Sequence, residues 1–525
     1  MNKITQYLNR QIVGNVFDQP SVLQNYATGR SILEIKPRLV ALPLTTSDVQ
    51  QLVRFSYNLA AKGYDLPITV RGSGLSKTGA NLGNGLIIST EHLDEIKEID
   101  ERSRLVCVQS GVTLAKLNAT LAVYGLTLPL LAHPQATIGG LISTLTTDPA
   151  AKKYGGIFYY IDRIEAVLSN GEVLQTTSLN SRGLKRLERD TSFSASIHRD
   201  IKQLLDQHFD TIEDITTHPR QFAGYSLVTQ VARHRNFDLA PLFAAAEGTL
   251  GVITEVILRC EPLPRPPLHC LASFNAIRPA LDFAKQLATL EPVTIDLYDA
   301  RIFRLAAESG KSSRLLKDGS NFHILASFHD SPRRFQSKLR KLKKLTDIPL
   351  LTEQNDNAAD FLTLRSGLIA YLNHDIDGQH PPLVDDVRIP KDQLPAFLTE
   401  LRQLELLFER ELPLFGSFAT DTYHVRPAFD LTDFGQRKSA LRFITNYAEL
   451  VAAHQGSLSG GSSEGRIKAI VTTSRLGVRE LALYHEIKNV FDPYHILNPD
   501  VKLGSSLLKV ARHLRTTPIP GPLEP

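Results

Sequence analysis

VRGSGLSKTG, at residues 70–79, is the most informative stretch of this 525-residue chain. It continues a short apolar run, LPITV at 66–70, that is typical of a β-strand. Gly72, Gly74 and Gly79 allow the backbone to adopt positive φ angles and to approach a ligand closely. Successive backbone N–H groups in such a loop form a concave anion site, and the neighbouring hydroxyls add donors. The stretch therefore indicates a pyrophosphate-binding loop, with a tight surface turn as the alternative.

This loop differs from two common nucleotide-binding loops. No Gly-Lys-Ser or Gly-Lys-Thr follows its glycines, which excludes a Walker loop. Its glycine spacing is not G-x-G-x-x-G and no helix pattern begins directly after it, which excludes a Rossmann fingerprint. Two further glycine segments follow, HPQATIGGLIST at 133–144 and AAAEGTLGVITEVIL at 244–258. Each of these alone is compatible with an ordinary turn before an apolar run.

The pattern around the loops divides the chain into parts. Up to residue 261, strand-like and helix-like segments alternate, with a helix that Ser47 would cap and a hairpin around Asn170-Gly171. Four prolines in CEPLPRPP, at 260–267, end this region. An α+β segment with an antiparallel sheet is expected next, and a last helix begins near Arg479. The expected parts are an N-terminal extension (1–36), a first domain (37–264), a second domain (265–478), a segment that returns to the first domain (479–504) and a tail (505–525).

Composition and charge exclude several classes of protein. The net charge is only +4, and the densest basic run, at 333–344, is typical of the solvated face of a helix, so we expect no nucleic-acid partner. Three cysteines, no two of them two or three residues apart, cannot build a cysteine-ligated zinc or iron–sulfur site, and so few cysteines do not indicate a disulfide framework. No segment has the pattern of a signal peptide or a transmembrane helix. The sequence therefore predicts a cytoplasmic protein.

Taken together and in this order, the three glycine segments resemble the FAD-binding domain of vanillyl-alcohol-oxidase-type (PCMH-type) flavoproteins. The nearest subgroup is the FAD-linked D-2-hydroxy-acid dehydrogenases, which include the glycolate oxidase flavin subunit and D-lactate dehydrogenase. The family motifs match residues 70–76, 137–140 and 247–254 of this chain. The resemblance implies an α+β fold, with a two-lobed PCMH-type FAD-binding domain at 37–264 and an antiparallel-sheet cap with helices at 265–478.

The resemblance also implies which residues hold the FAD. Relatives with a covalent flavin carry a histidine in the first loop, where this chain has Leu75, so a non-covalent FAD is expected. The first segment would surround the pyrophosphate, the second the flavin and ribityl chain, and the third the adenine side, while Asn498 would reach the flavin edge. The expected FAD-binding residues are Arg71, Gly72, Ser73, Gly74, Leu75, Ser76, Pro134, Thr137, Gly139, Gly140, Thr144, Glu247, Gly248, Gly251, Val252, Ile253 and Asn498.

The catalytic half departs from the family pattern. Ser417 and Gly461 stand where relatives carry a histidine and a glutamate that bind a divalent metal ion, so no metal site is expected. A different metal site, built from Asp421, His424 and Glu464, is the less favoured alternative. Solvated side chains are the commoner explanation for such a set.

Three residues remain as catalytic candidates. Ser462 occupies the place of the family's base, which leaves His424 as the candidate base for the substrate hydroxyl. Arg365 matches an arginine that binds the substrate carboxylate, with a helix-surface arginine as an equal alternative. Arg466 matches the closing arginine of the second family motif in the cap.

The implied function is oxidation of a hydroxy acid or a related alcohol at its CH–OH group, by hydride transfer to N5 of the flavin and without a metal ion. The alternative is a flavin-carrying electron-transfer or assembly subunit of a multi-subunit dehydrogenase, without substrate chemistry of its own. The expected partners are a small-molecule substrate and an electron acceptor or redox protein. The basic amphipathic tail at 505–525 leaves open a peripheral contact with the inner face of the membrane.

Overall fold

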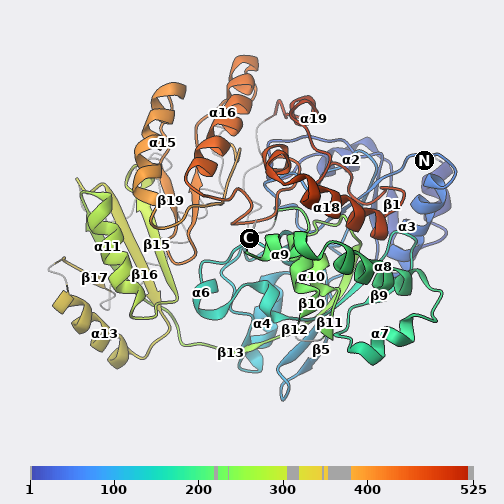
Figure 1. Cartoon of the computed structure of the whole chain (residues 1–525), viewed down its shortest axis with the longest axis horizontal. Helices are drawn as coiled ribbons and strands as arrows, with labels where there is room; N and C mark the ends of the chain where they lie inside the picture. Colours follow the sequence, from blue (N-terminus) through green and yellow to red (C-terminus); the bar gives the residue numbers. More distant parts are fainter. Residues whose placement is uncertain are drawn as a thin grey trace.

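The computed structural model describes residues 3–217, 223–233, 236–303, 319–345, 348–352 and 380–517. Figure 1 shows two bodies: the cap, with its yellow-green and orange helices, lies at the left, and a larger body of two lobes lies at the right. Helices and antiparallel sheets occur in both bodies, which confirms the predicted α+β class. No helix within the described ranges is long and apolar enough to cross a bilayer.

The first lobe is built on a four-stranded sheet that carries the first glycine loop at one end. Its strand order is β1-β2-β4-β3, with β2, β4 and β3 parallel to one another. The strands are β1 (Asn15–Phe17), β2 (Leu39–Leu42), β3 (Ile68–Arg71) and β4 (Leu86–Ser89). Helix α3 (Thr46–Ala60) buries its apolar stripe against this sheet. The cap of α3 is Thr45, whose side chain accepts from Asp48 N, and not the predicted Ser47, which lies inside the helix.

The second lobe is built on a five-stranded antiparallel sheet, in the order β5-β6-β12-β8-β9. The strands are β5 (Ile96–Asp100), β6 (Leu105–Gln109), β8 (Ile161–Val167), β9 (Val173–Gln175) and β12 (Val252–Arg259). Strands β8 and β9 form the predicted hairpin, and Gly171 has φ +86° in its turn. The third glycine segment leads directly into the central strand β12, and the second opens helix α5 (Ile138–Thr144).

The cap is a seven-stranded antiparallel sheet with helices packed against it (Figure 1). Its strands, in spatial order, are β17 (Leu351–Thr352), β14 (Leu268–Phe274), β16 (Phe322–Phe328), β15 (Thr294–Asp299), β19 (Leu414–Ser417), β20 (Thr422–Val425) and β18 (Val387–Arg388). Its main helices are α11 (Ile277–Ala288), α13 (Pro332–Leu345), α15 (Leu394–Phe408) and α16 (Phe434–Ala453). The basic run at 333–344 lies on α13, whose buried residues Phe335, Leu339 and Leu342 face the sheet.

After the cap, the chain returns to the second lobe. Helix α18 (Val478–Phe491) lies beside α8 (Phe193–Gln207) and α9 (Phe209–Thr217), and its residues Tyr484, Ile487 and Phe491 join the core of that lobe (Figure 1). Lys488 Nζ donates to Thr249 O at 2.7 Å and to Leu497 O at 2.8 Å. The chain after the cap is thereby tied to the third glycine segment.

The two ends of the chain pack differently from the expected extension and tail. β1 completes the first sheet, and Arg30 N donates to Gly74 O, so residues before 37 form part of the first lobe. The tail helix α19 (Leu507–Arg512) leads to Arg515, whose N–H donates to Ile32 O. The tail is thus hydrogen-bonded to the segment at residues 30–32, which is itself hydrogen-bonded to the first glycine loop.

Candidate functional site

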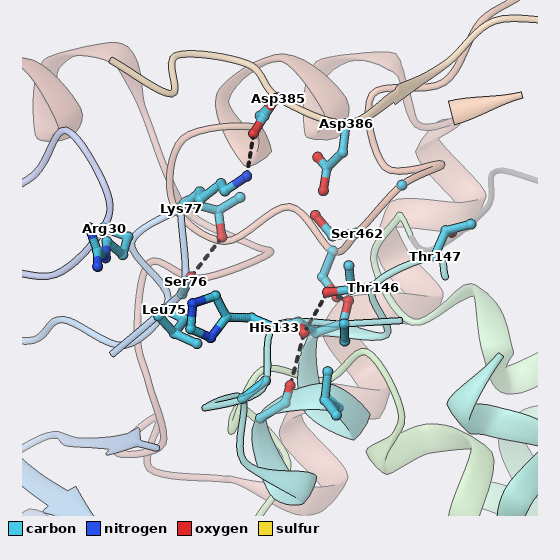
Figure 2. Close-up of a pocket in the computed structure, with 18 of the residues that line it drawn as sticks. Arg30, Leu75, Ser76, Lys77, His133, Thr146, Thr147, Asp385, Asp386 and Ser462 are labelled. Carbon is cyan, nitrogen blue, oxygen red and sulfur yellow. Dashed lines mark hydrogen bonds and ion pairs between the residues drawn. The ribbon is translucent and has the colours of Figure 1, made fainter. Parts of the chain in front are cut away.

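A cavity of about 400 Å³ lies between the two lobes and the cap. All three glycine segments line it from the lobes, and the 382–386 segment, β19 and β20 line it from the cap. Figure 2 shows Asp385 and Asp386 on the cap side, and Leu75, Ser76 and His133 on the side of the lobes. The fold thus places the predicted cofactor loops opposite the predicted catalytic motifs.

The first two glycine segments meet at the floor of this cavity. Gly74 has φ +75°, and a Cβ atom on it would lie 2.7 Å from Arg71 Nη2. A Cβ atom on Gly72 would overlap the side chain of Thr137. Thr137 itself caps α5, because its Oγ1 accepts from Gly140 N at 3.2 Å. The glycines are therefore required both by the backbone conformation and by the contact between the two segments.

Several buried polar atoms that face the cavity have no hydrogen-bond partner among the described residues. They are Ser110 Oγ, the amide group of Asn81 and Glu247 Oε1. The other oxygen of Glu247 accepts from Gly465 N at 2.8 Å. Burial raises the pKa of Glu247 to about 7, against the opposing effect of Lys502. Because buried polar groups are normally paired, this surface fits a ligand with many polar atoms.

Most of the predicted FAD-binding residues line the cavity. They are Gly72, Ser73, Gly74, Leu75, Ser76, Thr137, Gly139, Gly140, Thr144, Glu247, Gly248, Gly251 and Ile253. Arg71, Pro134, Val252 and Asn498 are not among the residues that line it. For these four, the predicted contact has no support in the geometry.

Three of the four have a different role in the structure. Arg71 turns behind its loop, where its Nη1 donates to Thr28 O at 2.8 Å. Val252 starts β12, and strand alternation directs it into the core of the first lobe while its neighbour Ile253 faces the cavity. Asn498 Nδ2 donates to Ala80 O at 2.8 Å and to Glu247 O at 2.7 Å, which joins the first and third segments.

His424 and Asp385 form the centre of the cap side. His424 Nδ1 lies 2.7 Å from Asp385 Oδ1, and the imidazole ring stacks on Phe415 with the ring centroids 4.8 Å apart. Asp385 Oδ2 accepts from Lys77 Nζ at 2.7 Å and from Arg426 Nη2 at 2.8 Å. Burial alone would raise the pKa of Asp385, but Arg426, Lys77 and His424 hold it well below its usual value. Asp385 is thus an ionised group that fixes the orientation of the His424 ring.

The other two catalytic candidates are Arg466 and Arg365. Arg466 does not line this cavity, because its guanidinium is buried and donates to Leu82 O at 2.8 Å and Pro499 O at 2.7 Å. The catalytic role predicted for Arg466 therefore has no support in this geometry, and its side chain instead joins the first lobe to the C-terminal segment. Arg365 lies outside the described residues.

The alternative metal site is not assembled. Glu464 is fully buried and paired with Lys502 Nζ at 2.6 Å, while Asp421 pairs with Lys391 Nζ at 2.5 Å. Within the part of the chain that the structure describes, no three His, Cys, Asp or Glu side chains gather as metal ligands.

Sequence reasoning missed several charged residues that line the cavity: Arg30, Lys77, Asp385, Asp386, Arg426 and Lys468. Arg30 lies in the expected N-terminal extension (1–36), so it was not considered as part of the cofactor domain. The one available signal was the pair of aspartates inside the apolar run LVDDVRIP, where two charges at a buried strand need an explanation.

Replacing Gly74 with valine is expected to abolish cofactor retention. The positive φ and the contact with Arg71 together force the loop to move. The ratio of flavin to protein after purification measures the effect. Gly63→Val is the matched control, because Gly63 has φ +80° with open space around it and lies outside the cavity. Full flavin content in Gly74→Val would mean that this loop does not contact the cofactor.

Two family models match the chain: the FAD binding domain at residues 37–177 and the C-terminal domain of FAD linked oxidases at residues 264–501. D-2-hydroxyglutarate dehydrogenase from Pantoea ananatis is 26% identical, over 90% of this chain and 48% of its own length. D-lactate dehydrogenase from Archaeoglobus fulgidus is 23% identical, over 88% of this chain and 90% of its own. The solved structure of 4-ethylphenol oxidase from Gulosibacter chungangensis superposes with a TM-score of 0.68 at 14% identity and covers 94% of both chains.

The matched FAD binding domain and the polar lining of the cavity indicate the same kind of ligand. The chain spans about half the length of the D-2-hydroxyglutarate dehydrogenases that it matches. The matched FAD binding domain contains the first two glycine segments, and the unpartnered polar atoms of the cavity suit the polar groups of a flavin and its ribityl chain. The cofactor is FAD, and Leu75, the position at which a covalent link was considered, has no group that could bond to it covalently.

Proposed function

Because the chain belongs to the FAD-linked oxidases, we propose that it oxidises the CH–OH group of a hydroxy acid or a related alcohol, with His424 as the base. The observation that carries this proposal is the His424–Asp385 pair, which faces the cofactor loops across one cavity. Bound FAD supplies the hydride acceptor.

The geometry around His424 suits proton abstraction. Asp385 accepts from Nδ1, which keeps the proton on that nitrogen and leaves Nε2 as the acceptor. Nε2 has no hydrogen-bond partner among the described residues, so it is available to the substrate hydroxyl. The stacked Phe415 ring holds the plane of the imidazole. The ionised Asp385 also stabilises the imidazolium that forms when the proton arrives.

A flavin-reduction screen tests the proposal. The purified holoprotein would be mixed anaerobically with D-2-hydroxy acids of different length, their L enantiomers and simple alcohols, while the loss of the oxidised flavin band is followed. We expect at least one hydroxy acid to reduce the flavin, with a preference for one enantiomer. If no compound reduces it, the alternative of an electron-transfer or assembly subunit is favoured.

Chelators are expected to leave this reduction unchanged. The reason is that two presumed ligand positions supply no good metal ligand. Ser417 has only a hydroxyl group. Gly461 has no side chain, and a Cβ atom there would overlap the backbone of Asp386. The measurement compares reduction rates before and after dialysis against EDTA, together with metal analysis. Stoichiometric zinc or manganese that leaves together with activity would contradict this expectation.

A further inference from the structure

The ammonium group of Lys468 is buried in the wall of the cavity and has no part in the chemistry described above. Its side chain is 1% exposed, and Nζ contacts Asp386 Oδ1 and lies 3.2 Å from Ser462 Oγ. An ammonium group carries three N–H donors, and these two partners use only two of them. The third has no partner among the described residues, although Lys468 lines the cavity.

Two consecutive aspartates, Asp385 and Asp386, hold the base His424 and Lys468. Asp385 holds the imidazole of His424, and the next residue, Asp386, holds Lys468. Gly461 packs so closely on the Asp386 backbone that no side chain fits there, and this contact brings Ser462 next to Lys468. Figure 2 shows Ser462 directly beneath Asp386, on the same side of the cavity as Asp385. The base and the cation are thus placed by adjacent carboxylates.

The three cations of this cluster have different partners. Lys77 and Arg426 pair with Asp385, whereas Lys468 pairs with Asp386. Lys77 and Arg426 both donate to the same oxygen of Asp385, so they are committed to the carboxylate that orients His424. Lys468 is not committed to Asp385, and its remaining N–H donor can bind a further anion.

We infer that Lys468 Nζ, with Ser462 Oγ beside it, binds the carboxylate group of the substrate next to the base His424. This inference rests on the proposed function, because it makes the substrate a hydroxy acid and not a simple alcohol. The carboxylate would accept the third N–H of Lys468. The hydroxyl on the neighbouring carbon would then lie on the side of His424.

Binding of oxalate to the holoprotein tests the inference separately from turnover. Oxalate has two carboxylates and no C–H bond to lose, so its binding is followed through the change in the flavin spectrum. We expect Lys468→Met to weaken oxalate binding by about tenfold or more and to raise KM for the hydroxy acid more than it lowers kcat. Lys468→Arg is expected to restore most of the binding, because the positive charge is kept.

Lys77→Met is the matched control, since it removes another ammonium group from the same cavity. Lys77 acts on Asp385, so this variant is expected to slow flavin reduction while the oxalate dissociation constant stays within about threefold.

Lys468→Met also leaves Asp386 unpaired. If that variant loses its flavin, the double variant Lys468→Met/Asp386→Asn is measured in its place, because it contains no buried unpaired charge.

The outcomes separate this inference from the proposed function. Unchanged oxalate binding in flavin-loaded Lys468→Met, or equal weakening in Lys77→Met, would overturn the role of Lys468 even if hydroxy acids reduce the wild-type flavin. Oxalate binding that depends on Lys468, in a protein that no hydroxy acid reduces, would support the carboxylate site and reject the oxidation. The absence of both reduction and oxalate binding in the wild type would reject both.

Discussion

Replacing His424 with alanine is expected to slow flavin reduction by the hydroxy acid about 10²- to 10⁴-fold, the usual contribution of a general base. FAD content and oxalate binding are expected to stay close to the wild-type values, because His424 holds neither the cofactor loops nor Lys468. Anaerobic stopped-flow absorbance measures the reduction rate.

Two further variants show whether the loss arises from the base itself. Asp385→Asn removes the charge that orients the imidazole, so reduction should slow while some base function remains. His485→Ala, on the exposed side of α18, should react like the wild type. A His424→Ala enzyme that reduces its flavin at the wild-type rate would show that another group accepts the proton.

Replacing Lys502 with methionine is expected to destabilise the protein by about 3–5 kcal/mol, the usual result of removing one partner from a buried ion pair. Lys502 and Glu464 are both 0% exposed, with Nζ and Oε2 2.6 Å apart. Glu464 Oε1 also accepts from Gly224 N at 2.9 Å and from Thr472 Oγ1 at 3.2 Å. The pair therefore joins the second lobe, the segment after the cap and the C-terminal segment at one point.

The midpoint of urea-induced flavin release measures this effect. Lys116→Met is the control, because Lys116 forms an ion pair with Asp94 in which both side chains are about half exposed, and its loss should change stability by less than about 0.5 kcal/mol. The double variant Lys502→Met/Glu464→Gln is expected to recover part of the loss, since it leaves no charged group unpaired. Equal midpoints for Lys502→Met and Lys116→Met would show that the buried pair does not hold these segments together.

The cofactor loops could be predicted from sequence because their requirements are local. Gly74 adopts a positive φ that other residues avoid, Thr137 caps a helix three residues before the N–H that it binds, and Asn170-Gly171 closes a tight hairpin. In each case the residue type itself specifies the backbone conformation. The three glycine segments in their order then carried the family resemblance, and that resemblance predicted an FAD-binding lobe pair and a cap.

The chemistry of the cap side was decided only by the tertiary structure. The partner of His424 lies 39 residues away in sequence, and that of Lys468 lies 82 residues away. No spacing rule connects such pairs, because the register of β18, β19 and β20 and the packing of the 461 loop on Asp386 bring them together. For the same reason Arg466, which matches a family motif, lies buried behind the cavity. A side chain's type limits which contacts it can form, but only the packed fold determines which partner it meets.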